Sequence, residues 1–253
     1  MDFRNYATLI ERTISDTIRS CYPITWLEDH ISLSLVNQLG RHAGAVSIDG
    51  FDRPFSVAWD FRKLRKPEET AFGDIGVLVN LTTWAGENLE GVGLLEAKRR
   101  DLNKSSFSST KQSQLARIAK NAPSAKLLLY DFDSVTSCMD NCYPQLSENY
   151  RDRFFRASNF THSVCVPART ALRIARYTTD LHKFGVPLSY QLIERYFRGF
   201  DLEMDPVILS SVKRNIGRHG APRILMLVGV STGSAAPVLP EVANDRYVRL
   251  DSV

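Results

Sequence analysis

The chain has 253 residues, of which 43% are hydrophobic and 24% charged, and its formal net charge is +4. This composition suits one globular domain with a sizeable core and excludes a low-complexity chain. The net charge is too small to indicate nucleic-acid binding by itself, so local clusters must carry that argument. No apolar run approaches the roughly 20 residues of a membrane span, and the N-terminus lacks a signal peptide's apolar core. We expect a cytoplasmic protein that does not associate with membranes.

The four cysteines show no CxxC pair. Cys138 and Cys142 could contribute to a zinc site, but no His lies near enough in sequence to complete a familiar ligand pattern. We therefore expect reduced, partly buried thiols.

The first 132 residues alternate helical and strand patterns. Apolar stripes predict a helix over residues 3–20 and a second one over 25–39, which ends at Gly40. The inward face of the second helix is expected to carry Leu27, Ile31, Leu35 and Leu39. The remaining predicted elements are strands at 46–48 and 55–61, a charged loop at 62–70, a hairpin, a helix from 109 or 110 to 120, and a strand at 126–132.

The second half of the chain is less regular. Residues 133–160 are polar and indicate a loop region with a short helix, followed by a strand that ends at Pro167. Helices are predicted over 168–179, 188–197 and 205–216, the last with Asp205 as N-cap and Pro206 in its first turn. A strong strand at 223–230 and an edge strand near the C-terminus return the chain to the sheet. We expect a single domain over residues 1–253.

The hairpin at residues 72–98 carries the most informative pattern. Its two apolar runs, 74–81 and 91–98, do not alternate with polar residues, so both strands are expected to be buried on two faces. Three charges interrupt them: Asp74, Glu96 and Lys98. An antiparallel register with its turn near Gly86 sets Asp74 opposite residues 97–99, about 5 Å away.

Charges in such buried strands need partners, a metal or a function. Glu96 and Lys98 lie two residues apart and therefore share a face of their strand. The hairpin thus predicts two carboxylates and an ammonium at one end of the sheet, which suits a metal site beside a lysine. The structural alternative is an ion pair between Glu96 and Lys98, with Asp74 capping a turn.

The order of elements resembles that of the PD-(D/E)xK nuclease superfamily, with Asp74 opening one strand and Glu96-Ala97-Lys98 closing the next. The resemblance covers about residues 25–132 and leaves 133–253 as a C-terminal α/β extension. It implies an α/β fold in which helices flank a mixed central sheet with a restriction-endonuclease-like core. It also implies hydrolysis of nucleic-acid phosphodiesters, DNA more than RNA. Gly73 stands where the family's name places a proline.

Oxygen ligands from Asp74, Glu96 and the Ala97 carbonyl suit Mg²⁺, for which Mn²⁺ can substitute. Lys98 is placed to orient the attacking water and to stabilise charge on the phosphate. In related nucleases a Gln on the following helix points to the metal, and Gln114 fits this role better than Gln112 because Ile118, four residues on, is apolar.

Two acidic residues are further candidates. The resemblance implies that Glu28 lies near the metal as the acidic residue of the family's first helix. Alternatively, Thr25 to Glu28 form a capping box, in which Glu28 bonds back to the cap residue. Asp60, at the end of its strand, is a weaker candidate.

Basic residues cluster in two places. Residues 98–120 hold seven Lys or Arg against one Asp, and Arg169, Arg173 and Arg176 fall at helical spacing. Such stripes can track phosphates, although many are simply solvated faces.

The sequence therefore predicts an Mg²⁺-dependent deoxyribonuclease, acting alone as a homo-oligomer or as the nuclease component of a prokaryotic defence, restriction or DNA-processing assembly. A second hypothesis is a catalytically inactive protein of the same fold that binds nucleic acid or serves as a scaffold. A third is a metallohydrolase of another type, which the absence of a His-rich ligand set disfavours.

Overall fold

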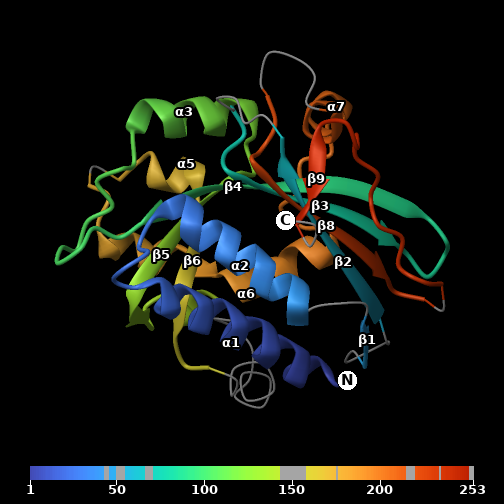
Figure 1. The fold of residues 1–253 in the computed structure, drawn as a ribbon, viewed down its shortest axis with the longest axis horizontal. Coiled ribbons are helices and arrows are strands. Elements are labelled where there is room, and N and C mark those ends of the chain that lie inside the picture. The colour runs from blue at the N-terminus through green and yellow to red at the C-terminus, as the bar shows by residue number, and fades with distance from the viewer. Residues whose placement is uncertain are drawn as a thin grey trace.

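The computed structural model describes residues 1–42, 46–49, 55–65, 71–142, 158–174, 176–214, 220–233 and 235–250. They form an α/β fold in which helices flank one mixed, mostly antiparallel sheet of nine strands (Figure 1). The strands are β1 (Val46–Ile48), β2 (Phe55–Leu64), β3 (Ile75–Thr82), β4 (Asn88–Arg99), β5 (Lys126–Val135), β6 (Thr161–Pro167), β7 (Val186–Pro187), β8 (Ile224–Ser231) and β9 (Tyr247–Arg249).

The sheet order is β1-β2-β8-β3-β4-β5-β6-β7, and β9 also pairs with β2. Two neighbouring pairs are parallel, β3 with β8 and β4 with β5. Strand β8 is buried along its whole length and lies between β2 and β3. The C-terminal part of the chain thus supplies a central strand directly beside the hairpin formed by β3 and β4.

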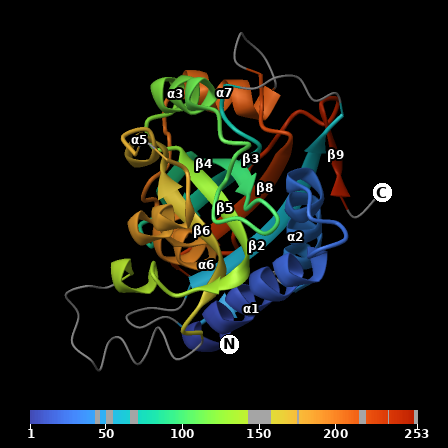
Figure 2. The same cartoon turned by 90° about the vertical axis from the view of Figure 1, so that its left-hand side faces the viewer.

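Two long helices cover one face of the sheet and shorter ones cover the other (Figure 2). The first face carries α1 (Phe3–Cys21) and α2 (Glu28–His42), and the second carries α3 (Gln112–Asn121) and α5 (Ala168–Ala171). Alternate residues of β5 divide between the two cores: Leu128 packs toward α1 and α2, and Leu127 toward α3. This alternation is what a strand buried on both faces requires.

The remaining helical segments lie in the second half of the chain. They are η1 (Met139–Asn141), η2 (Thr179–Phe184), α6 (Leu188–Tyr190), the π-helical turn η3 (Gln191–Arg195), η4 (Tyr196–Arg198) and α7 (Pro206–Arg214). The predicted helix over 188–197 is therefore present but irregular. Asp205 caps α7 as predicted, since its carboxylate accepts the Val207 N–H at 2.7 Å.

The second helix begins three residues later than predicted. The Thr25 hydroxyl donates to the Cys21 carbonyl, and the first helical hydrogen bond of α2 joins the Ile31 N–H to the Leu27 carbonyl. Leu27 is consequently 62% exposed, so its predicted inward position is wrong. The predicted core positions further along this helix are buried.

The predicted helix over 168–179 is also wrong, because α5 ends at Ala171. Beyond it the chain pairs with the loop after β4: the Phe107 N–H donates to the Tyr177 carbonyl, and the Thr179 N–H donates to the Ser105 carbonyl. These bonds hold the segment extended. The three arginines at helical spacing therefore form no continuous helical stripe.

All four cysteines are buried free thiols. No helix among the described residues combines the length and apolarity that a membrane crossing needs.

A buried carboxyl group in α1 gives a stability prediction. Glu11 accepts hydrogen bonds from Ser15 at 2.8 Å and from Ser189 at 2.5 Å, and its burial raises its pKa. A raised folded-state pKa stabilises the fold at low pH, and this stability is lost as the pH rises above the unfolded value of about 4.3. Glu11→Gln is therefore expected to melt at a higher temperature than wild type at pH 8, with a difference that shrinks toward pH 4.

Glu11→Ala is the matched variant. It leaves two buried hydroxyl groups without their acceptor and should lose about 1–3 kcal/mol of stability. Thermal melts at several pH values measure both changes. An advantage of the Gln variant that does not vary with pH would contradict the raised pKa of Glu11.

Candidate active site

Asp74 is fixed at the edge of β4, immediately before β3 begins. Its N–H donates to the Leu95 carbonyl at 2.9 Å, and its carboxylate accepts the Ala97 N–H at 3.0 Å. The hairpin ladder pairs Ile75 with Leu95, so Asp74 lies opposite Glu96 and not opposite residues 97–99. The predicted register is therefore shifted, but the side chain still reaches the strand that carries Glu96 and Lys98.

Glu96 lies at the centre of a short chain of polar contacts. It is 2% exposed, and its Oε1 accepts from Lys98 Nζ at 2.5 Å and from Gln114 Nε2 at 2.7 Å. The parallel crossover from β4 through α3 to β5 places Gln114 over this face of the sheet. Gln112, the alternative on the same helix, is exposed. The structure thus brings together Asp74, Glu96, Lys98 and Gln114.

The two carboxylates oppose each other's ionisation. Burial raises the pKa of Glu96 to about 7, and the nearby charge of Asp74 adds to this shift. Burial also raises the pKa of Asp74, although the Lys98 ammonium partly offsets it. Burial alone would lower the pKa of Lys98, but the carboxylates of Glu96 and Glu28 give a net upward shift. Additional positive charge at this site would favour the ionised form of both acids.

Glu28 joins the site from the first residue of α2. Its carboxylate accepts from the Ser109 hydroxyl at 2.5 Å and lies 3.6 Å from Lys98 Nζ. It also accepts the Arg99 N–H at 3.4 Å. The capping box with Thr25 does not form, because the helix begins only at Glu28. Glu28 is instead a neighbour of the buried ammonium.

A cleft of about 180 Å³ opens beside these groups, between the start of α2 and the beginnings of β3 and β8. Its polar lining residues are Glu28, Asp29, Ser32, Lys63, Asp74 and Arg223. Ala97 also lines the cleft. Because the N–H and carbonyl of one strand residue face the same edge, and the Ala97 N–H points to Asp74, the Ala97 carbonyl faces this side as well.

Asp60 is not part of this site. It is 7% exposed and forms ion pairs with Arg62 at 2.6 Å and with Arg249 at 3.1 Å. Strands β8 and β3 separate its strand from β4. The structure does not bring this candidate to the other carboxylates.

The donor set fits a hard cation. No group of three or more His, Cys, Asp or Glu side chains in the described ranges is arranged to hold a metal ion. Mg²⁺ does not need such a group, because it commonly binds through one or two carboxylates and keeps several waters. Asp74 and Ala97 line the cleft, and Glu96 is buried next to Ala97 in β4. The two carboxylates and the Ala97 carbonyl together form a donor set of this kind.

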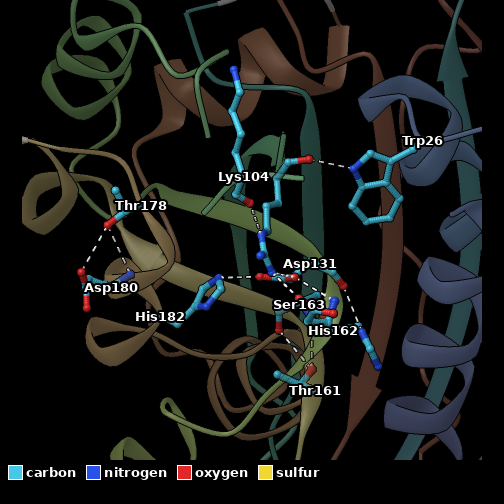
Figure 3. A network of polar contacts seen from close by, with 11 residues as sticks. Trp26, Lys104, Asp131, Thr161, His162, Ser163, Thr178, Asp180 and His182 are labelled. Atoms are coloured by element: carbon cyan, nitrogen blue, oxygen red, sulfur yellow. Dashed lines mark hydrogen bonds and ion pairs between the residues drawn. The ribbon is translucent and has the colours of Figure 1, made fainter. Parts of the chain in front are cut away.

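A polar network just beyond the end of β4 was not predicted from the sequence (Figure 3). Arg100, two residues beyond Lys98, donates to Asp131 at 2.9 Å and to Asp133 at 2.7 Å, and its Nε donates to the Lys104 carbonyl. His182 lies 3.8 Å from Asp131, and its burial lowers its pKa to about 4, so it is neutral near pH 7. The network anchors the loop that follows β4. The sequence contained a signal for Arg100: it follows Glu96 and Lys98 at the same two-residue spacing, which continues the charged face of the strand.

Comparison of the chain with protein-family models, with curated proteins and with solved structures finds no match. What the site does must therefore be inferred from its geometry.

Proposed function

We propose that the protein is a metal-dependent nuclease that hydrolyses nucleic-acid phosphodiester bonds, DNA in preference to RNA. The observation that carries this proposal is the convergence of Asp74, Glu96 and Lys98, with Asp74 also lining an open cleft. Two hard carboxylates with an adjacent ammonium are what phosphodiester hydrolysis needs. The order of α2, the strands up to β4, α3 and β5 also supports a restriction-endonuclease-like core.

Asp74, Glu96 and the Ala97 carbonyl would hold Mg²⁺, or Mn²⁺ in its place. The bound ion would neutralise developing phosphate charge and lower the pKa of a water molecule. Lys98 is placed to orient the attacking water and to stabilise the negative charge that develops on the phosphate. Gln114 and Glu28 would position these groups. Gln114 donates to the Glu96 carboxylate, and Glu28 pairs with the Lys98 ammonium.

The reaction balances without any other reactant. Water attacks phosphorus, one phosphorus–oxygen ester bond breaks, and the leaving oxygen takes up a proton. The products are a phosphomonoester and a free hydroxyl group.

The proposal is tested by incubating the wild-type protein with supercoiled plasmid and with linear DNA in Mg²⁺, Mn²⁺ or EDTA. We expect cleavage with either ion and none in EDTA. Nicked or linearised plasmid would identify an endonuclease, and loss of linear DNA alone would identify an exonuclease. Cleavage that persists undiminished in EDTA would contradict metal-dependent chemistry.

Gln114 gives a further prediction as a positioning residue. Its amide donates to Glu96 without reaching the cleft lining, so Gln114→Ala should weaken apparent Mg²⁺ affinity by about tenfold. The measurement is the Mg²⁺ concentration that gives half-maximal cleavage. Gln112→Ala is the matched control on the same helix and should leave that concentration unchanged. Equal Mg²⁺ requirements in both variants would contradict this role.

A second candidate is a binding protein of the same architecture without catalysis. The observation that favours it is that Lys98 and Gln114 both bond to one oxygen of Glu96, which is also how a satisfied structural ion pair looks. Binding of DNA with no cleavage in any divalent ion would support this candidate instead.

A further inference from the structure

The loop between α1 and α2 exposes an unusual amount of apolar surface beside the candidate site. Ile24 is 94% exposed, Leu27 62% and Tyr22 37%, and Pro23 between them is also exposed. We name these four residues the apolar tip. Single exposed apolar residues are ordinary, but several on one short loop indicate a contact surface.

The apolar tip is built on a firmly held loop. The Trp26 indole is buried and donates to the Arg100 carbonyl at 2.8 Å. The Tyr22 ring stacks on Phe132, with centroids 4.5 Å apart. Within the loop, the Thr25 N–H donates to the Cys21 carbonyl at 3.0 Å. The exposed side chains are thus presented by anchored neighbours, which lowers the entropy lost when a ligand is bound.

The apolar tip adjoins the catalytic groups directly. Leu27 precedes Glu28, whose carboxylate lies 3.6 Å from Lys98 Nζ. The bond between Trp26 and Arg100 also ties the loop to the end of β4, where the chain leaves the site. Glu28 also lines the cleft, so Leu27 is next in the chain to a cleft residue.

Exposed cations lie on both segments that hold the apolar tip. Arg19, in the last turn of α1, is exposed, and Lys104 is exposed on the loop after β4. The side chain of Lys104 extends away from the other residues of the network (Figure 3). Apolar side chains together with cations complement a ligand that has flat apolar faces and a phosphate backbone.

We propose that the apolar tip contacts unstacked nucleobases next to the phosphodiester bound at the candidate site, an inference that rests on the proposed function. Proline, isoleucine and leucine are among the side chains that proteins insert between base steps. The contact would favour single-stranded or frayed nucleic acid, because stacked duplex bases first have to be separated there.

The test uses the full-length protein in EDTA, so that binding is measured without cleavage. A labelled single-stranded oligonucleotide carrying 2-aminopurine reports affinity by anisotropy and base unstacking by fluorescence. The double variant Ile24→Ser, Leu27→Ser should bind about tenfold more weakly, equivalent to about 1.4 kcal/mol, with an unchanged salt slope. The rise in 2-aminopurine fluorescence that accompanies binding to wild type should also be absent with this variant. Circular dichroism confirms that the variant folds.

Two variants are the controls. Lys104→Ala should lower the salt slope by about 0.7, as loss of one phosphate contact on a single strand does. Val207→Ser replaces a side chain that is 69% exposed on α7 and should change nothing. Wild-type affinity and fluorescence in the double variant, or no binding of nucleic acid by wild type, would overturn the inference. If binding depended on Ile24 and Leu27 but no divalent ion supported cleavage, the nuclease proposal would be rejected, and the proposed contact between the apolar tip and nucleobases would stand.

Discussion

Replacing Lys98 by Ala is expected to reduce DNA cleavage by at least ~10³-fold even when the metal site is saturated. Lys98 donates to Glu96 but is an ammonium, which cannot be a metal ligand. Its proposed role in catalysis is to orient water and to stabilise charge on the phosphate, and it also lowers the pKa of Asp74 and Glu96. Some loss of metal affinity is therefore expected beside the loss of cleavage. Mn²⁺ binding followed by electron paramagnetic resonance, beside a cleavage assay, separates the two effects.

Asp74→Asn and Glu96→Gln are the matched variants, because each keeps the size of the side chain and removes a charged oxygen ligand. We expect both to lose cleavage and to bind Mn²⁺ at least tenfold more weakly. Gln112→Ala, exposed on α3, should match wild type in both assays. If Asp74→Asn and Glu96→Gln bound Mn²⁺ as wild type does, the metal would lie elsewhere.

The second large effect is expected at Gly73, directly before Asp74. Its φ is +95°, a conformation that disfavours side chains, and a Cβ there would lie 2.6 Å from the Leu95 carbonyl oxygen. Gly73→Ala should lose about 3 kcal/mol from these two effects together. In a domain of this size the loss corresponds to a fall in Tm of roughly 6–12 °C.

The matched control is Gly86→Ala in the hairpin turn. Gly86 also has a positive φ, +81°, but a Cβ there meets nothing within 4 Å. It should lose only about 1 kcal/mol. Gly73→Ala should in addition reduce cleavage about 10²-fold in folded protein, because Asp74 moves with its neighbour. Equal Tm values for the two variants would contradict the close approach to Leu95.

The geometry at Gly73 also excludes proline at this position. Proline fixes φ near −65°, which is incompatible with +95°. A proline here would have to redirect the chain that places Asp74 against the Ala97 N–H.

The sequence predicted the hairpin and its charges well because their signals are local. Two apolar runs around a turn specify β3 and β4, and the spacing of Glu96 and Lys98 specifies a shared face. The helix that carries Gln114 also begins near its predicted start. The observed pairing of β3 with β4 is shifted from the predicted register. The residues around the turn do not show which pair begins the ladder of hydrogen bonds.

Features that depend on distant contacts could not be predicted. Nothing local to residues 223–230 shows that β8 pairs in parallel with β3 and antiparallel with β2. Trp26 fixes the start of α2 through a carbonyl 74 residues away. Pairing with Ser105 and Phe107 prevents the helix predicted over 168–179. In each case a long-range hydrogen bond overrides a local propensity.

The most direct test of the proposed metal-dependent centre is cleavage of supercoiled plasmid by wild type and Lys98→Ala, each with its metal site filled by Mn²⁺. We predict nicking or linearisation by wild type and at least ~10³-fold less by the variant at equal metal occupancy. Equal cleavage by the two proteins would show that Lys98 and its carboxylate partner form a structural ion pair, and would contradict the proposed centre.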